Sequence, residues 1–348
     1  MVRRILFTSV ALAPIVVLVH YLFHPTETVD FVLAAAALIP LAWLIGEATE
    51  HAAEHTGPGI GGFLNATFGN APELIIALFA VSAMEFEVVR GSLTGSVVGN
   101  LLLVLGFSLL FGGRGEIDRP SSFLALGLVA GTTLLLLIPS IPGWEGDPER
   151  DELVKLSIPV SVVLLVAYVV LTWYSLRRHA ALHIASDAEI AGWSLRFALL
   201  VLGLATVVTA LVAEILVGSI DKFAEESGLS EFFLAAVVIA IVGNAAEHGG
   251  AVVVAARGKI KLAAEIALAS SAQVAVFLIP AVALLALLIE PLALSFRKVE
   301  IGALAVSVVV TSILLADGRS SRLKGVILIA VYVGIAVAFY LAGERPEG

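Results

Sequence analysis

Two matched segments decide how this chain folds: Gly69-Asn70-Ala71-Pro72-Glu73 and Gly243-Asn244-Ala245-Ala246-Glu247. Both read Gly-Asn-Ala-x-Glu, and the second begins 174 positions after the first, which is half of the 348-residue chain. Each places a glutamate in a stretch otherwise apolar enough to cross a membrane. A carboxylate at the bilayer centre costs about 2.5–3.5 kcal/mol on insertion scales, and such residues mark ion or proton pathways. The duplication therefore predicts one site built from two repeats.

The composition indicates a membrane protein. The chain is 59% hydrophobic and 14% charged, with a mean hydropathy of +1.04, whereas soluble domains contain about 25% charged residues. Because it has no cysteine, disulfides, thiolate metal sites and cysteine nucleophiles are excluded. We expect an all-α polytopic fold and a transporter rather than an enzyme.

Apolar stretches near the length of about 20 residues that a spanning helix needs recur along the whole chain. They predict eleven transmembrane helices, at residues 5–23, 30–55, 60–84, 89–112, 121–140, 153–175, 194–218, 231–256, 260–289, 296–316 and 323–343. The connections between them contain proline, glycine and charge, as at Gly57-Pro58-Gly59.

The basic residues predict the orientation of these helices. Alternate connections hold thirteen of the twenty lysines and arginines on one side, and the other side holds seven: Arg90, Arg150, Lys155, Lys222, Arg297, Lys298 and Arg345. The richer side is expected in the cytoplasm. The N-terminus is then cytoplasmic, and the C-terminus lies outside the cell membrane. Two acid-rich loops, Glu145–Glu152 and Asp221–Glu231, fall on the outer side; they either attract cations or are simply solvated.

Five spans separate the two Gly-Asn-Ala-x-Glu copies, so the copies enter the membrane from opposite sides. This predicts one leading helix followed by two five-helix repeats of inverted topology, which is typical of transporters with a site near the midplane. The predicted divisions are an N-terminal helix at 1–29, a first repeat at 30–176, a cytoplasmic linker at 177–193 and a second repeat at 194–348.

The residues around the first glutamate predict a break in its helix. Pro72 lacks an amide hydrogen, and Gly69 adds backbone freedom. A break frees backbone carbonyls, which are tolerated in a membrane only where they line a cavity or bind a ligand. With the glutamate and asparagine oxygens they would form an all-oxygen anionic site that suits a hard cation such as Ca²⁺. The second copy has Ala246 in place of proline, so its break depends on Gly243 alone.

The candidate cation and proton ligands are therefore Glu73 and Glu247, with Asn70 and Asn244 three positions before them. Other polar side chains in these spans either line the site or join helices through hydrogen bonds. They are Ser96, Asn100, Ser270, Ser271, Gln273, Glu50 and His248. Glu47, Glu50 and Glu54 share one helical face and could form an acidic lane to the cytoplasm or a solvated helix end.

Two facing glutamates also predict coupling. Both ionised, they need a divalent cation; without it, repulsion and burial favour their protonation. Ca²⁺ and protons would then compete for the same oxygens. We expect Ca²⁺ and H⁺ as transported substrates and no cofactor. The expected partners are the lipid bilayer and these ions, not nucleic acid, and a homo-oligomer is left open.

At these residues the chain resembles a known family. The stretch from Gly46 to Ile76 is similar to the first signature of the calcium/proton exchangers of the calcium/cation antiporter superfamily; it contains Gly61-Gly62-Phe63-Leu64-Asn65-Ala66-Thr67-Phe68-Gly69-Asn70-Ala71-Pro72-Glu73-Leu74-Ile75. The second signature is similar to Val242–His248 together with Ser270–Phe277. The resemblance implies exchange of cytoplasmic Ca²⁺ for external H⁺ by alternating access through an eleven-helix fold, with the two glutamates carrying Ca²⁺ and protons.

Two other functions remain open at this level. A Na⁺-coupled Ca²⁺ exchanger of the same superfamily would share the repeats and the glutamates. More remotely, His51-Ala52-Ala53-Glu54-His55 fits the H-x-x-E-H pattern of a group of zinc proteases, although the sequence offers no evident third zinc ligand.

Overall fold

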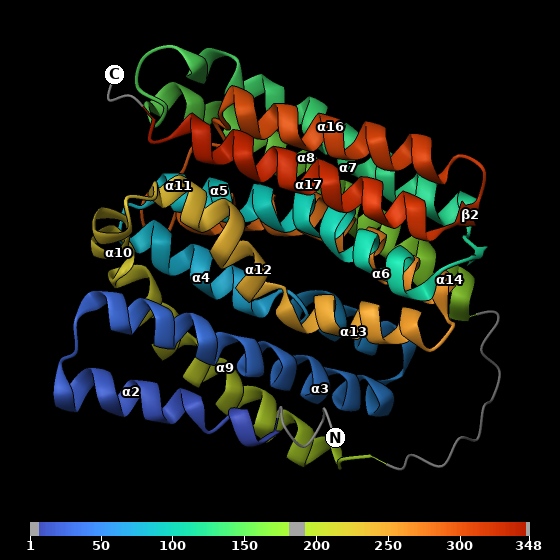
Figure 1. The fold of residues 1–348 in the computed structure, drawn as a ribbon, viewed down its shortest axis with the longest axis horizontal. Helices are drawn as coiled ribbons and strands as arrows, with labels where there is room; N and C mark the ends of the chain where they lie inside the picture. Colours follow the sequence, from blue (N-terminus) through green and yellow to red (C-terminus); the bar gives the residue numbers. More distant parts are fainter. Residues whose placement is uncertain (1–6, 181–191, 346–348) are drawn as a thin grey trace.

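The computed structural model describes residues 7–180 and 192–345, and at 57–63, 65–66, 174–180 and 246–248 it describes the backbone alone. Helices dominate this part of the chain (Figure 1). The first half contains α2 (Leu12–Phe23), α3 (Glu27–Phe68), α4 (Ala71–Ser82), α5 (Phe86–Val98), η1 (Gly99–Val104), α6 (Leu105–Gly112), β1 (Gly115–Glu116), α7 (Arg119–Ser140), η2 (Pro142–Trp144) and α8 (Asp151–Ala180).

The second half continues with a similar sequence of long and broken helices. Its elements are α9 (Leu195–Gly218), α10 (Ile220–Ser227), α11 (Glu231–Phe233), η3 (Leu234–Ile239), α12 (Ala240–Gly243), α13 (Ala245–Ala256), α14 (Ile260–Gln273), η4 (Val274–Leu278), α15 (Ile279–Ala286), α16 (Lys298–Leu315), β2 (Arg319–Ser320) and α17 (Arg322–Ala342).

Within the described residues, eight helical segments are long and apolar enough to cross a bilayer. A ninth arises if Ile220–Ser227 and Glu231–Gly243, bent by 110° from each other, form one span. Two shorter apolar helices lie at Phe7–Phe23 and Ala71–Ser82. The chain is therefore a multi-pass membrane protein, as predicted, and each predicted range overlaps one of these helices. The count of eleven crossings stays a prediction.

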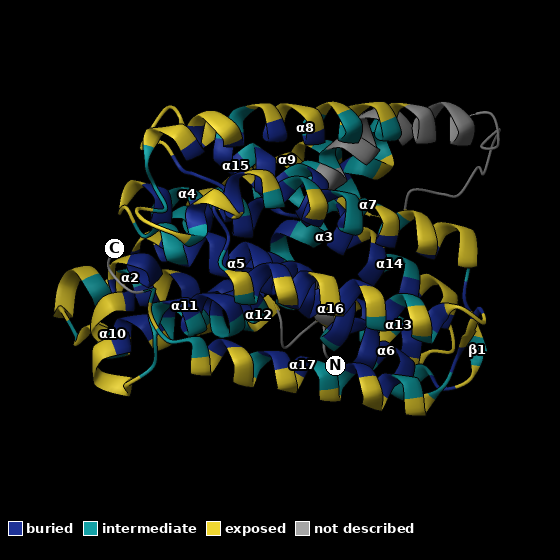
Figure 2. Cartoon of the chain, turned by 90° about the horizontal axis from the view of Figure 1, so that it is seen from above, coloured by how far each residue is buried: buried dark blue, intermediate teal, exposed yellow. Residues whose placement is uncertain are grey.

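Burial separates central helices from peripheral ones (Figure 2). The apolar window of the α5–η1–α6 span is 83% buried and that of α14–η4–α15 is 72% buried, whereas α17 is 28% buried. A helix that is apolar all round and buried belongs to the core, while an exposed apolar face suits lipid. The two spans that follow the glutamate motifs therefore form the centre of the bundle.

Both glutamate motifs interrupt a helix at their asparagine. Asn70 separates α3 from α4 with φ −102° and ψ 15°, and Asn244 separates α12 from α13 with φ −90° and ψ 6°. Pro72 occupies the first turn of α4, where its missing N–H removes no helical hydrogen bond. The second break forms without a proline, so the difference predicted between the two copies does not appear in the backbone.

Several connections differ from the sequence prediction. Gly57-Pro58-Gly59 lies inside α3 instead of forming a connection, so Pro58 does not end that helix. The Asp221–Glu231 loop contains the helix α10, whose Ile220 and Ala224 are buried one turn apart, which anchors an amphipathic helix. Short strands β1 and β2 pair antiparallel, with Gly115 opposite Ser320.

The helices run between two ends of the molecule (Figure 1). The β1–β2 pair marks one of them, which we call the strand-pair end. At the other end, which we call the Arg90 end, Arg90 of α5 meets the α7–α8 connection through Glu149 and the non-helical 291–297 segment through Ala293. Arg345, at the end of the described chain, pairs there with Glu87 at 3.0 Å.

Candidate functional site: a glutamate pocket between the two halves

Glu73 borders a small pocket between the first and the second half of the chain. The pocket is lined by Glu73 and Ile76 of α4, Ser92, Leu93 and Ser96 of α5, and Ile239 and Ala240 at the η3–α12 junction. Glu73 is 8% exposed. It lies in the first turn of α4, where the positive end of the helix dipole favours a carboxylate. The pocket therefore combines a buried acid with two serine hydroxyls.

The second motif closes on the first at this pocket. A Cβ atom at Gly243 would lie 3.2 Å from Cγ and 3.6 Å from Cδ of Glu73. The absence of a side chain at Gly243 thus lets the backbone of the second motif approach the carboxylate of the first. The predicted convergence of the two segments is observed for Glu73 and Gly243.

Four polar side chains next to the pocket form a hydrogen-bonded group, which we call the amide cluster: Ser96, Asn100, Asn244 and Ser270. Asn244 Nδ2 donates to Ser96 Oγ at 2.7 Å. Asn100 Nδ2 donates to Ser270 Oγ at 2.9 Å and to Asn244 Oδ1 at 3.3 Å. All four side chains are buried. The cluster joins one serine and one asparagine from each half of the chain.

Asn244 also fixes the break in its own helix. Ala240 O accepts from the backbone N–H of Asn244 at 3.3 Å and from its Nδ2 at 2.9 Å. The side chain thereby adds a second hydrogen bond to the carbonyl of Ala240, the first residue of α12. In this conformation the side-chain oxygens of Asn244 and Ser96 accept hydrogen bonds from within the chain. A cation bound to these oxygens would have to replace those bonds.

The remaining predicted ligands fall into two groups. Asn70 is buried at the first helix break, with 1% of its surface exposed. Glu247 and His248 belong to α13, and Glu247 occupies the same third helical position as Glu73 does in α4. The side chains of Glu247 and His248 lie outside the described residues, so their predicted roles stay predictions.

Three further candidates lie outside the pocket lining. Ser271 is buried and donates to Ala267 O of its own helix at 2.9 Å. Gln273 is half-buried where α14 passes into η4. Glu50 is exposed on α3, and the structure does not bring it to the pocket. Its predicted place near the site was inferred from helical spacing alone, which does not show which face is covered.

The acidic lane is arranged around a histidine. His51 lies 3.6 Å from Glu47 and 3.3 Å from Glu54. Its ring lies against that of Trp193, with centroids 5.0 Å apart and a tilt of 33° between the planes. His55 Nε2 is 2.8 Å from the carbonyl oxygen of Trp193. The end of the predicted linker thus docks on α3, while residues 181–191 of that linker lie outside the described residues.

These contacts give no support to the zinc-protease interpretation. Over the part of the chain that the structure describes, one group of three carboxylates lies within 4.8 Å, and it consists of Glu85, Asp221 and Glu231. His51 and His55 are not in it. The group joins the α4–α5 turn to α10 and α11; burial, and after it the nearby Asp221 carboxylate, raise the pKa of Glu85.

Sequence reasoning missed two apolar residues that shape the site. Ile239 and Ala240 line the pocket although they are ordinary apolar residues in the sequence. Gly91 and Gly95 of α5 allow the second half of the chain to approach closely: a Cβ at Gly95 would lie 2.0 Å from Ala236 O. At Gly99, four residues after Gly95, a Cβ would meet no described atom within 4 Å beyond the local helix backbone.

The described residues form a multi-pass helical membrane protein with a buried glutamate between its two halves, and comparison with known proteins gives its family. The family described as sodium/calcium exchanger protein matches residues 26–177 and again residues 197–341. The chain belongs to this family, which confirms the resemblance seen in the two signatures.

Individual relatives cover nearly the whole chain. A Ca²⁺/H⁺ antiporter of Aphanothece halophytica is 35% identical over 372 residues, covering 99% of this chain and 98% of its own. The Ca²⁺/H⁺ antiporter ChaA of Bacillus subtilis is 35% identical over 351 residues, covering 97% and 99%. The solved structure of native YfkE matches with a TM-score of 0.84 at 34% identity, covering 97% and 99%. These relatives are named as antiporters, in agreement with the expectation of a transporter rather than an enzyme.

Proposed function

We propose that this protein exchanges Ca²⁺ for H⁺ across the membrane by alternating access. The observation that carries the proposal is the Glu73 pocket, in which a buried carboxylate of the first half is pressed against Gly243 of the second half. A buried acid in a membrane protein is costly unless it binds a cation or a proton. The Ca²⁺/H⁺ antiporters at about 35% identity support the same assignment.

The donor atoms around the pocket favour a hard cation. Glu73, Ser92 and Ser96 offer oxygen atoms, and the described lining of the pocket includes no nitrogen or sulfur ligand. Ca²⁺ takes six to eight oxygen ligands at about 2.3–2.6 Å in flexible geometry. Asn70, Asn244 and Glu247 would supply further oxygens when the amide cluster opens around the ion.

Competition for two glutamates would couple the fluxes. With Ca²⁺ bound, Glu73 and Glu247 are both ionised; when Ca²⁺ leaves, their mutual repulsion and burial favour protonation. One Ca²⁺ is electrically equivalent to two protons at such a pair. The site is then neutral, whether it holds Ca²⁺ or protons, when its access switches from one side of the membrane to the other.

An inverted repeat explains how one site can open to both sides. The family matches the chain twice, in ranges that begin 171 residues apart, at 26 and 197. The wide helical turns η1 (Gly99–Val104) and η4 (Val274–Leu278) follow the two glutamate motifs at equivalent distances. Such π-helical turns are common at functional sites. We assign residues 30–176 and 194–348 to the two repeats, after a leading helix at 1–29 and with a linker at 177–193.

The sidedness follows from the same plan. At the strand-pair end, β1 of the α6–α7 connection pairs with β2 of the α16–α17 connection. Many of the thirteen basic residues of the richer side lie at this end. We therefore place the strand-pair end and the N-terminus in the cytoplasm, and the Arg90 end and the C-terminus outside.

The test is uptake by proteoliposomes in which a pH gradient or a Na⁺ gradient is imposed separately, with ⁴⁵Ca²⁺ as the tracer and Mn²⁺ or Mg²⁺ as competitors. Proton-driven ⁴⁵Ca²⁺ uptake that is insensitive to Na⁺ is expected. Uptake driven by Na⁺ and indifferent to pH would identify the Na⁺-coupled alternative instead.

A further inference from the structure

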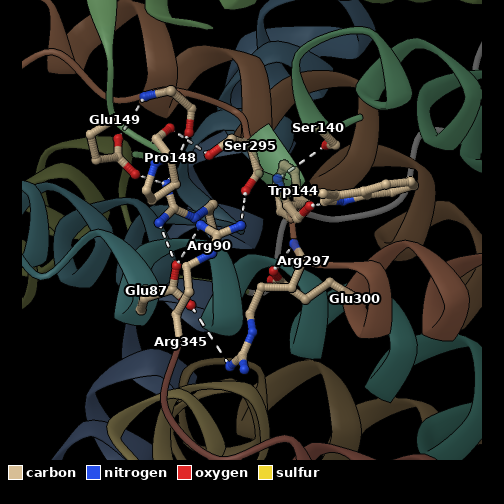
Figure 3. Close-up of polar contacts among 12 residues, drawn as sticks. Glu87, Arg90, Ser140, Trp144, Pro148, Glu149, Ser295, Arg297, Glu300 and Arg345 are labelled. Carbon is tan, nitrogen blue, oxygen red and sulfur yellow. Dashed lines mark hydrogen bonds and ion pairs between the residues drawn. The ribbon is translucent and has the colours of Figure 1, made fainter. Parts of the chain in front are cut away.

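Six charged side chains meet at the Arg90 end, away from the glutamate pocket (Figure 3). We call them the charge cluster; it comprises the guanidinium groups of Arg90, Arg297 and Arg345 and the carboxylates of Glu87, Glu149 and Glu300. Arg90 was predicted to be one of seven basic residues on the outer side, yet it is 1% exposed. None of the six lines the Glu73 pocket.

Arg90 and Glu149 together bind both backbone polar groups of Ala293 in the 291–297 segment. Arg90 Nη1 pairs with Glu149 and donates to Ala293 O at 3.1 Å. Glu149 Oε2 accepts from Ala293 N at 3.1 Å. Arg90 Nη2 donates to Glu87 at 2.6 Å. A guanidinium is suited to this work because its planar fork can engage several acceptors at once.

The 291–297 segment is itself held in place by hydrogen bonds. Its buried backbone groups bond to side chains of the α7–α8 region, and each of these contacts is well formed. They are Ser157 Oγ with Leu294 N at 2.8 Å, Ser140 Oγ with Phe296 N at 3.0 Å, and Trp144 Nε1 with Phe296 O at 3.0 Å. Arg90 therefore attaches α5 to a rigid part of the structure.

The same helix carries the serines of the cation pocket. On α5, Ser92 and Ser96 line the pocket, while Thr94 Oγ1 donates to the buried Glu300 at 3.0 Å. Because a helix rises 1.5 Å per residue, Ser96 lies about 9 Å along the axis from Arg90. A displacement of the Arg90 end of α5 would move both hydroxyls relative to Glu73.

Stability alone does not account for this arrangement. Burying a guanidinium and its carboxylates has a large desolvation cost, and apolar replacements of such groups are often neutral or stabilising. An ion cluster instead fixes one geometry among several. We propose that Arg90 is a positioning residue for the cation site: by clamping α5 to Glu149 and the 291–297 segment, it sets the distance of Ser92 and Ser96 from Glu73. This proposal rests on the assignment of the Glu73 pocket as the Ca²⁺ site.

The test compares Arg90→Lys, Glu149→Gln and the control Lys155→Met in purified protein. Lys155 is an exposed cation on α8, so its loss changes the charge without touching α5. Equilibrium Ca²⁺ binding should weaken roughly tenfold or more in the first two variants, since a misplacement of about 1 Å costs on the order of 100-fold in positioned reactions. Lys155→Met should bind Ca²⁺ as the unaltered protein does.

A second readout does not depend on Ca²⁺. The chain contains no cysteine, so Ser92→Cys introduces a single thiol that reports the position of α5. Its rate of modification by a small maleimide should change severalfold when Glu149→Gln is added, and not when Lys155→Met is added. Unchanged labelling in the Glu149→Gln background would overturn the proposal, whether or not Arg90→Lys folds. Changed labelling, together with a failure of the unaltered protein to bind Ca²⁺, would uphold the positioning role and refute the proposed function.

Discussion

Replacing Gly95 by alanine should force α5 and η3 apart. The added Cβ would lie 2.0 Å from Ala236 O and 2.7 Å from Ala240 Cβ. A carbon–oxygen contact needs about 3.3 Å, so the helices would have to separate by roughly 1.3 Å at this point. Overpacking of this kind costs about 1–3 kcal/mol and occasionally more, and it would act at the place where the two halves enclose the pocket.

Gly99→Ala is the matched control on the same span. Among the described residues, and apart from the local helix backbone, no atom lies within 4 Å of a Cβ at Gly99, and alanine is preferred to glycine in a helix by about 1 kcal/mol. Thermal unfolding in detergent should show Gly95→Ala as destabilised and Gly99→Ala as unchanged or stabilised. ⁴⁵Ca²⁺ uptake by Gly95→Ala should fall by at least about tenfold, because Ser92 and Ser96 move with α5. Equal melting temperatures and uptake in the two variants would refute the close-packing argument.

Three further predictions follow from individual contacts. Gly243→Ala should crowd Glu73, whose Cγ would lie 3.2 Å from the new Cβ, and should raise the half-saturating Ca²⁺ concentration. Gly249→Ala is the control, because a Cβ there meets no described atom within 4 Å beyond the local helix backbone; equal Ca²⁺ saturation in both variants would contradict the prediction. Asn100→Leu removes the bonds to Ser270 and Asn244 and should cost about 1–3 kcal/mol for each buried polar group left unsatisfied, measured as chemical unfolding; a loss below about 0.5 kcal/mol would show that the amide cluster does not contribute. The hydrogen bond from Lys324, and then that from the Arg319 N–H, lower the pKa of Asp317. Its stabilising contribution is therefore present above the ordinary carboxyl pKa near 4 and is lost as the pH falls through the folded-state value, so the difference in melting temperature between the unaltered protein and Asp317→Asn should shrink on acidification; a constant difference would contradict the assignment.

The apolar stretches and their order were predictable because each is long enough to form a helix across a bilayer. Their boundaries were less predictable, since Gly57-Pro58-Gly59 lies inside α3. The positions of the two motif breaks were also predictable, since glycine and asparagine both disfavour a continuous helix relative to the apolar residues around them. The second break needed no proline: Asn244 supplies the hydrogen bond that closes α12. That solution depends on Ser96 and Asn100, which come from another helix, so local sequence could not reveal it.

Part of the site was hidden for a related reason. Ser96, Asn100 and Ser270 were candidates, but their pairing into one cluster depends on how α5 and α14 cross. Glu50 shares a face with Glu47 and Glu54 in the sequence, yet helical spacing does not tell which face neighbouring helices cover. Arg90 was assigned to the outer side from charge counting, and its burial results from Glu149 and Ala293, which are 59 and 203 positions away.

The central claim is that Ca²⁺ and protons compete for Glu73 and Glu247. The most direct measurement is the number of protons released when Ca²⁺ binds to purified protein in weakly buffered solution near neutral pH. Competition at a pair of carboxylates predicts a release of up to about two protons per Ca²⁺. Glu73→Gln or Glu247→Gln should reduce both the release and the binding, whereas the exposed control Glu50→Gln should leave both unchanged. Ca²⁺ binding without proton release, or release that persists in both glutamine variants, would contradict the account.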